Sequence, residues 1–116
     1  MAEAKNLSSP DETRTFDKGK LEIVEVNGSQ VGRATFEPGW KWSECVKPIA
    51  GTDSCQVEHF GYVVSGHMAL RYDDGSTQEV GPGDLAHMPA GHDAWIVGND
   101  TCVVVDFMGA PTYAKK

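Results

Sequence analysis

Turn signals recur along nearly the whole chain, and their spacing is the feature that most limits the possible fold. Short clusters of Gly, Pro, Asn and Asp occur roughly every eight to twelve residues. The clearest are Asn27-Gly28, Pro38-Gly39, Ser65-Gly66, Asp73-Asp74-Gly75, Gly81-Pro82-Gly83 and Gly98-Asn99-Asp100. Because these residues favour turns and interrupt helices, their spacing predicts many short strands in a sandwich or barrel and no long helix.

The segments between the turns have the composition of strands. Several are rich in Val, Ile, Tyr, Trp and Phe, which suit a half-buried pleated surface. The expected strands cover residues 21–26, 30–36, 39–46, 56–64, 67–72, 77–80, 85–88, 94–97 and 102–107. The Asp73-Asp74-Gly75 turn is expected to join two of them in a tight hairpin.

The length of 116 residues fits a single domain. Residues 1–15 have no apolar rhythm and predict a flexible N-terminal arm, and residues 113–116 predict a short C-terminal tail. Residues 16–112 are therefore expected to form the folded domain.

The chain is acidic, with 17 Asp and Glu against 10 Lys and Arg, and a net charge of −7. Such a surface repels phosphate backbones and anionic lipid headgroups, so we expect neither nucleic acid nor a membrane as a partner. The chain has no apolar targeting segment and no run near the roughly eighteen apolar residues of a membrane span, which predicts a cytoplasmic protein. The 3 cysteines are then expected to be reduced thiols.

Residues 83–91 resemble a motif of a known family. Gly83, Pro89 and Gly91 have the spacing of the second cupin motif, which is a glycine, five residues, a proline, one residue and a glycine. The segment 62–66, Tyr-Val-Val-Ser-Gly, resembles the end of the first cupin motif, and counting back from Gly66 puts His59 at the position of the acidic metal ligand. The resemblance covers about residues 20–108. It implies an all-β, single-domain, cupin-type jelly-roll β-barrel.

The same resemblance implies a divalent metal in the barrel mouth and often a homodimer. Cupins include dioxygenases, decarboxylases, isomerases, storage proteins and sugar-sensing modules, so the fold does not name a reaction. This chain has no His-x-His before His59, and Ala94 stands where the last motif histidine is usual, with His92 two places earlier. The segments 40–44, 51–55 and 91–95 resemble small bacterial cupins of unassigned role, which usually have histidine at the position of Cys45.

His59, His92 and Cys45 form the preferred set of metal ligands. Strand alternation gives His59 a face shared with residues 57, 61 and 63, and in a cupin register that face lines the barrel lumen. His92 follows the turn at which a cupin chain re-enters the barrel. Cys45 would add a thiolate, which favours zinc or a softer ion over magnesium or calcium. Three donors with an open position for water predict a catalytic zinc or iron site.

Cys55 is a weaker candidate, although it shares the face of His59. In an unbroken strand the Cα atoms of residues four apart lie roughly 13 Å from each other, so Cys55 could join His59 only through a bulge or bend. His87 and His67 are expected to face outward, towards solvent or a partner subunit.

The remaining candidates concern a small-molecule ligand. Glu44 and Tyr62 are the predicted acid, base or substrate-orienting groups. Trp42 and Trp95 are predicted to line a substrate pocket, although a core or interface role suits them too.

Two functions stay open from the sequence. One is a metal-dependent enzyme that acts on a small organic molecule, and the other is a metal-free binding or sensing module without turnover. A metal-free proton-transfer enzyme that uses His92 and Asp93 lies between them.

Overall fold

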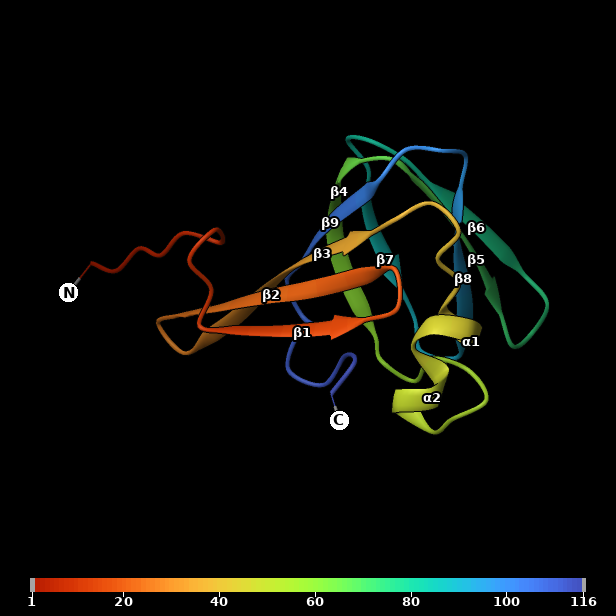
Figure 1. The fold of residues 1–116 in the computed structure, drawn as a ribbon, viewed down its shortest axis with the longest axis horizontal. Helices are drawn as coiled ribbons and strands as arrows, with labels where there is room; N and C mark the ends of the chain where they lie inside the picture. The colour runs from red at the N-terminus through yellow and green to blue at the C-terminus, as the bar shows by residue number, and fades with distance from the viewer. Residues whose placement is uncertain (1, 116) are drawn as a thin grey trace.

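Two antiparallel sheets face each other and enclose the core of the protein (Figure 1). The computed structural model describes residues 2–115. The elements are β1 (Glu12–Phe16), β2 (Gly19–Val26), β3 (Ser29–Phe36), α1 (Trp42–Cys45), α2 (Lys47–Ala50), β4 (His59–Ser65), β5 (His67–Tyr72), β6 (Thr77–Val80), β7 (Leu85–Met88), β8 (His92–Val97) and β9 (Cys102–Asp106). One sheet has the order β1-β2-β3-β9-β4-β7 and the other β6-β5-β8. The all-β prediction is confirmed, and the two sheets fit a jelly roll.

Alternation along the strands positions the core between the sheets. In β5, Met68 and Leu70 are buried while His67 and Arg71 are exposed. Successive side chains of a strand point to opposite faces, so each sheet gives one row to the core and one row to solvent. The largest fully buried side chains are Trp40, Trp42, Leu21, Leu70, Val46, Val63, Cys55 and Cys102.

Gly66 allows the chain to cross from one sheet to the other. It lies between β4 and β5 with a φ of 74°, a left-handed conformation that favours glycine. A Cβ atom at this position would lie 2.6 Å from the Cα atom of Cys102. The Ser65-Gly66 turn predicted from the sequence therefore has a strict requirement for glycine. The predicted hairpin at residues 73–75 is also present, with β5 and β6 paired on either side of it.

Residues 39–46 do not form the expected strand. They contain α1, in which Cys45 N–H donates to Lys41 O at 2.9 Å and Val46 N–H donates to Trp42 O at 2.9 Å. The Asp93 carboxylate, on β8, accepts a hydrogen bond from Ser43 N–H in the first turn of this helix. This partner lies fifty residues away in the sequence, so local composition gives no sign of it.

Both ends of the chain contribute more to the fold than the sequence predicts. β1 begins at Glu12, within the expected flexible arm, and pairs with β2 along its whole length. Most of its side chains are exposed, as expected for an edge strand, and they therefore have no apolar rhythm. At the other end, Tyr113 and Ala114 are only 5% and 6% exposed, so this segment packs against the core instead of extending as a tail.

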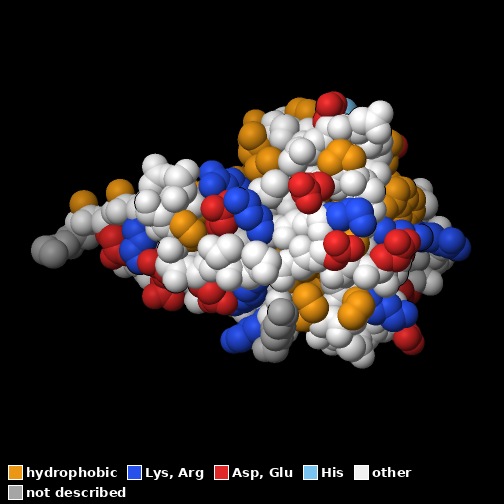
Figure 2. Space-filling view, in the orientation of Figure 1, with side chains coloured by type: hydrophobic (Ala, Val, Ile, Leu, Met, Phe, Trp, Pro, Cys, Tyr) orange, Lys and Arg blue, Asp and Glu red, His pale blue; other side chains and the backbone are white. Residues whose placement is uncertain are grey.

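Acidic and basic side chains lie interspersed over the face seen in Figure 2, with hydrophobic patches over the upper part of the barrel. No helix among residues 2–115 is long and apolar enough to cross a membrane. The expected homodimer and the expected cytoplasmic location stay predictions.

The two faces of the sheets predict different effects for the same substitution. Leu70→Ala, at a position that is 0% exposed, is expected to lower the free energy of unfolding by about 2–5 kcal/mol because it leaves a cavity. Leu85→Ala, at a position that is 65% exposed, is expected to change it by no more than about 0.5 kcal/mol. Urea unfolding of metal-free protein measures both values. Equal losses would be inconsistent with the assignment of inner and outer faces.

Candidate metal centre

Cys55, His59 and His92 bring three donor atoms together inside the barrel. One ligand atom from each residue lies within 4.8 Å of the other two, and Cys55 Sγ is 3.9 Å from His59 Nε2. Cys55 is 2% exposed and His92 is 3% exposed, so water has little access to the group. The structure thus joins two of the predicted ligands to a different cysteine.

A bend in the chain brings Cys55 to His59. Cys55 lies outside β4 and forms a β-bridge with His92 of β8, with Cys55 N–H donating to His92 O at 2.7 Å. The chain then leaves that edge and enters β4 at His59. Because residues 56–58 are not part of a strand, the separation of roughly 13 Å expected for an unbroken strand does not apply.

Asp106 fixes the orientation of the His59 ring. Its Oδ2 atom lies 2.6 Å from His59 Nδ1, so Nε2 is the ring nitrogen that faces Cys55. Asp106 ends β9, the neighbour of β4 in the sheet, and is 6% exposed. Its Oδ1 atom accepts hydrogen bonds from the N–H groups of Met108 and Gly109. Metal-ligating histidines commonly donate their other N–H to such a carboxylate.

The backbone fixes His92 in a similar way. His92 Nδ1 lies 2.7 Å from the carbonyl oxygen of Pro89, within the Pro89-Ala90-Gly91 turn that leads into β8. A carbonyl only accepts hydrogen bonds, so Nδ1 carries the proton and Nε2 is free to bind a metal. Both histidines therefore present Nε2 to the group.

The surroundings of Cys55 and of His59 shift the pKa of both side chains. Burial raises the pKa of the Cys55 thiol, but the adjacent His59 and His92 rings outweigh it and lower this pKa to about 6. Burial lowers the pKa of His59, whereas hydrogen bonds with Asp106 and Cys55 outweigh it and raise this pKa to about 9. The metal-free protein therefore holds a thiolate beside an imidazolium at neutral pH. Metal ligation requires that thiolate.

The donor set fits a divalent transition metal. Zinc binds thiolate at about 2.3 Å and imidazole at about 2.0–2.1 Å, so two such ligands at a tetrahedral angle lie about 3.5 Å apart. The 3.9 Å between Cys55 Sγ and His59 Nε2 needs only a small closure to reach that value. Thiolate and imidazole suit zinc and related ions better than magnesium or calcium. Three protein ligands leave a fourth position for water or substrate.

The cavity beside these donors is small and mostly apolar. Its volume is about 40 Å³, which is room for one or two water molecules. Aromatic and aliphatic side chains form most of its wall, among them Leu21, Phe36, Trp42, Leu70 and Val104. Trp42 lines this cavity, and its role in a substrate pocket stays a prediction.

Cys45, Glu44 and Trp95 lie away from the metal group. Cys45 is buried in α1, and its Sγ atom lies 3.8 Å from Asp17 Oδ2. Glu44 and Trp95 line a shallow groove on the outer surface, where Lys41 Nζ lies 5.9 Å from the centre of the Trp95 ring. Cys45 and Glu44 were predicted as site residues on a strand. They lie instead on the helix α1, which turns Cys45 towards the core and Glu44 towards solvent.

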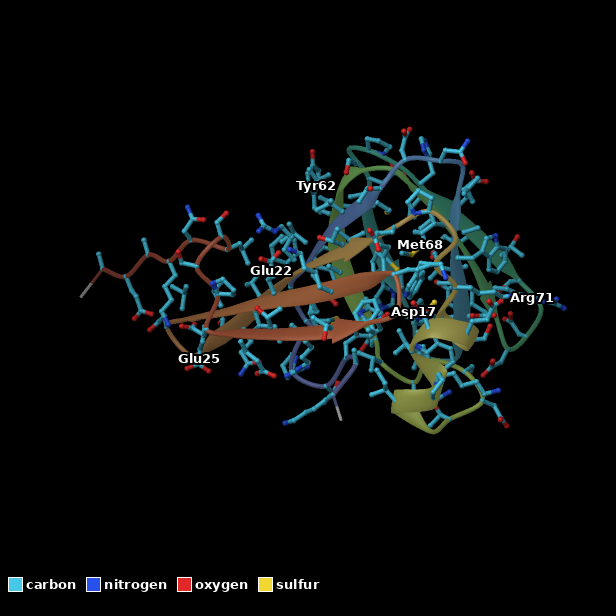
Figure 3. All side chains as sticks on the ribbon, in the orientation of Figure 1. Asp17, Glu22, Glu25, Tyr62, Met68 and Arg71 are labelled. Carbon is cyan, nitrogen blue, oxygen red and sulfur yellow. The ribbon has the colours of Figure 1, made fainter. Side chains whose placement is uncertain are left out.

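Tyr62 also lies outside the cavity. It is 41% exposed on the outer face of β4, and Figure 3 shows it on the outside of the barrel whereas Met68 lies between the sheets. Phe60 and Val64 share this outer face. The alternation that turns His59 and Gly61 inward requires Tyr62 to point outward.

Two residues of the site, Asp106 and Tyr113, were not predicted. Asp106 could have been found, because alternation along β9 turns Cys102, Val104 and Asp106 to the inside, and a buried carboxylate needs a partner. Tyr113 follows the last strand and has no periodic pattern around it, so the sequence contains no comparable signal.

The low pKa of Cys55 predicts a measurable titration in metal-free protein. The ultraviolet absorbance of the thiolate is expected to appear with a midpoint of about 6, and His59→Gln is expected to move that midpoint up towards the ordinary value of about 8.5. His87→Ala, an exposed histidine paired with Glu58, is the control and should leave it unchanged. An ordinary midpoint in the unchanged protein would refute this account of the group's charges.

The two shifted pKa values make the stability of the folded protein depend on pH. The lowered pKa of Cys55 contributes stability that is fully present above the ordinary thiol pKa of about 8.5 and is lost as the pH falls through about 6. The raised pKa of His59 contributes stability that is present below 6.5 and is lost as the pH rises through about 9. The Cys55 thiolate and the His59 imidazolium are therefore both charged in the folded protein between about pH 6 and about pH 9.

Comparison with known proteins agrees with this architecture. The family model of the cupin domain matches residues 45–108. A mutant of Bacillus subtilis oxalate decarboxylase is 19% identical with a TM-score of 0.63, covering 92% of this chain and 29% of that one. The Lactobacillus farciminis oxalate decarboxylase–formate complex is 19% identical with a TM-score of 0.60, covering 88% and 32%. A Vibrio parahaemolyticus protein of unknown function is 13% identical with a TM-score of 0.56, covering 78% and 88%.

These similarities establish the fold and the family but no reaction. The chain spans about a third of the length of the two decarboxylases, and no curated protein matches it. The family model covers more than half of the 116 residues, including His59, Asp106 and the turn before His92. The chain belongs to the cupin family.

Proposed function

We propose that this cupin binds one divalent transition metal, zinc or iron, through Cys55, His59 and His92, and acts there on a small organic molecule. The convergence of three donors, two of them buried and His59 partly exposed, is the observation that carries the proposal. The hydrogen bond on the second ring nitrogen of each histidine supports it, since this is the usual environment of a ligating imidazole.

The residues around the donors have distinct roles in this proposal. A metal bound there polarises a carbonyl group or lowers the pKa of a bound water. Asp106 and the Pro89 carbonyl keep both imidazoles turned towards the ion. Trp42 and the other apolar walls exclude bulk water, which strengthens electrostatic interactions inside the cavity.

The walls of the cavity suggest a class of substrate. No Lys or Arg among residues 2–115 lines it. Metal ligation requires the neutral imidazole of His59, so with the metal bound a dianion such as oxalate would have no cationic side chain to offset the cost of leaving water. We therefore propose a neutral molecule, or one with a single anionic group that meets the metal, whose apolar part contacts the aromatic and aliphatic walls.

A binding or sensing module without turnover is the second candidate. The observation that favours it is the position of Glu44 and Tyr62, the predicted proton-transfer groups. Both are exposed and neither lines the cavity.

Metal analysis of cysteine variants tests the proposed ligands. Protein purified without chelator is expected to contain about one equivalent of zinc or iron. Cys55→Ser is expected to weaken zinc binding by at least about 100-fold, because losing only an outer hydrogen bond to a ligand costs about 10–100-fold. Cys45→Ser is the matched control and should retain the metal, as should His87→Ala.

Two results would count against this assignment. One is a wild-type protein that stays metal-free after incubation with Zn²⁺ or Fe²⁺. The other is an equal loss of metal in Cys45→Ser and Cys55→Ser, since that would give the two cysteines the same role.

Turnover separates the two candidate functions. Zinc- or iron-loaded protein is expected to gain thermal stability with small neutral ketones or phenols and to convert at least one of them to product, as followed by mass spectrometry. Stabilisation of metal-free protein to the same extent, with no product, would favour the binding module instead.

A further inference from the structure

The cavity in this structure is too small for the proposed substrate. Pockets for organic ligands have volumes of about 300–1,000 Å³, whereas the cavity lined by His59 and His92 measures about 40 Å³. If the proposed function holds, part of the wall must move before a molecule larger than water can reach the metal. The question is which segment of the wall can move without unfolding the sheets.

Residues 109–114 cover the centre without belonging to either sheet. They form turns beyond the end of β9, and Figure 1 shows this end of the chain beside β1. The Tyr113 ring lines the cavity and meets the His59 ring edge to face, with ring centres 5.2 Å apart. It also packs edge to face against the Phe16 ring, with ring centres 6.1 Å apart. Tyr113 thus fills the space between the metal group and β1.

Arg14 of β1 holds this segment by hydrogen bonds to its backbone. Its Nη1 atom donates to the carbonyl oxygens of Ala110 and Tyr113, both at 2.8 Å, and its Nη2 atom donates to Pro111 O at 3.2 Å. The Arg14 side chain is only 9% exposed, and Glu12 accepts a further hydrogen bond from it at 2.6 Å. One side chain therefore makes three contacts that all depend on the same position of the segment.

Asp106 links the other end of the segment to the metal group. The carboxylate that holds His59 through Oδ2 accepts hydrogen bonds from Met108 and Gly109 through Oδ1. Gly109 lies so close that a Cβ atom there would overlap His59 Nδ1. The segment therefore starts at a fixed point, beside the ligand itself. Its further attachments to the barrel are the Arg14 hydrogen bonds and the packing of Tyr113 and of the small side chains of Ala110 and Ala114.

We propose that residues 109–114 are a lid over the metal centre, with Tyr113 as the side chain that fills the mouth and Arg14 as the latch. The lid swings from Asp106 when the Arg14 hydrogen bonds break, and this opening admits the substrate. The sheets and the three donors keep their positions. This inference rests on the proposed function for its purpose, but its geometry is independent of any bound metal.

Alkylation of Cys55 in metal-free protein tests the lid directly. Iodoacetamide labelling, resolved by peptide mass spectrometry, is expected to be slow in the unchanged protein. Tyr113→Ala and Arg14→Met are expected to label Cys55 at least about tenfold faster. Tyr113→Phe keeps the ring, so the labelling of Cys55 should stay slow in this variant. It thereby distinguishes the effect of the ring's bulk from that of the hydroxyl group. Arg33→Met, which removes contacts to Glu22 and Leu7 elsewhere on the sheet, is the matched control for Arg14.

Cys102, which is 0% exposed in the core, reports unfolding in the same experiment. The lid predicts faster labelling of Cys55 alone, and a wild-type Cys55 rate that is insensitive to low urea concentrations, as expected for a local opening. Unchanged Cys55 rates in both variants would overturn the proposal. So would equal acceleration of Cys55 and Cys102, or a wild-type Cys55 rate that rises with urea in parallel with that of Cys102.

Metal release separates this inference from the proposed function. In zinc-loaded protein, Tyr113→Ala is expected to keep one equivalent of zinc but to lose it to EDTA at least about tenfold faster. A protein that binds no zinc yet shows the Cys55 labelling pattern would contradict the metal proposal and leave the lid standing. Zinc binding with unchanged rates of Cys55 labelling and zinc release in the variants would contradict the lid and leave the metal proposal standing.

Discussion

The hydrogen bond between the buried Asp106 carboxylate and His59 is the interaction on which the site depends. Burying a charged group is costly unless it is paired and hydrogen-bonded. Asp106 meets this requirement with His59 on one oxygen and two backbone N–H groups on the other. Removing either partner would leave the other charge buried alone, at a cost of about 3–5 kcal/mol. The pair therefore fixes one ring nitrogen of His59 and leaves the other for a ligand, and it fixes the start of the segment that covers the centre.

The crossing between the two sheets explains why three donors meet at one point. His59 opens β4 in the large sheet and His92 opens β8 in the small one. Cys55 bridges to β8 before the chain enters β4, so it lies where the sheets approach each other. A site built in this way needs no additional element, because the ends of paired strands hold the side chains. The access of solvent and small molecules to this site then depends on residues 109–114, which cover that end of the barrel.

Much of the fold could be predicted from the sequence, because turn residues and period-two alternation are local. The same alternation turned His59 inward and should have excluded Tyr62, which follows it by three residues. The choice between Cys45 and Cys55 could not be made in this way. It depends on a helix with a first turn held by Asp93, and on an irregular segment at residues 56–58, and both result from contacts distant in the sequence. β1 and Tyr113 were missed for a related reason, since an exposed edge strand and a single packed turn leave no periodic signal.

X-ray absorption at the zinc edge tests the central claim most directly, since it reports the atoms bound to the ion. The account predicts, for zinc-loaded protein, one sulfur at about 2.3 Å and two imidazole nitrogens at about 2.0–2.1 Å, with one further light atom completing a four-coordinate shell. The sulfur contribution should disappear in Cys55→Ser and persist in Cys45→Ser. A first shell of oxygen and nitrogen alone, or a sulfur that persists in Cys55→Ser, would contradict the account.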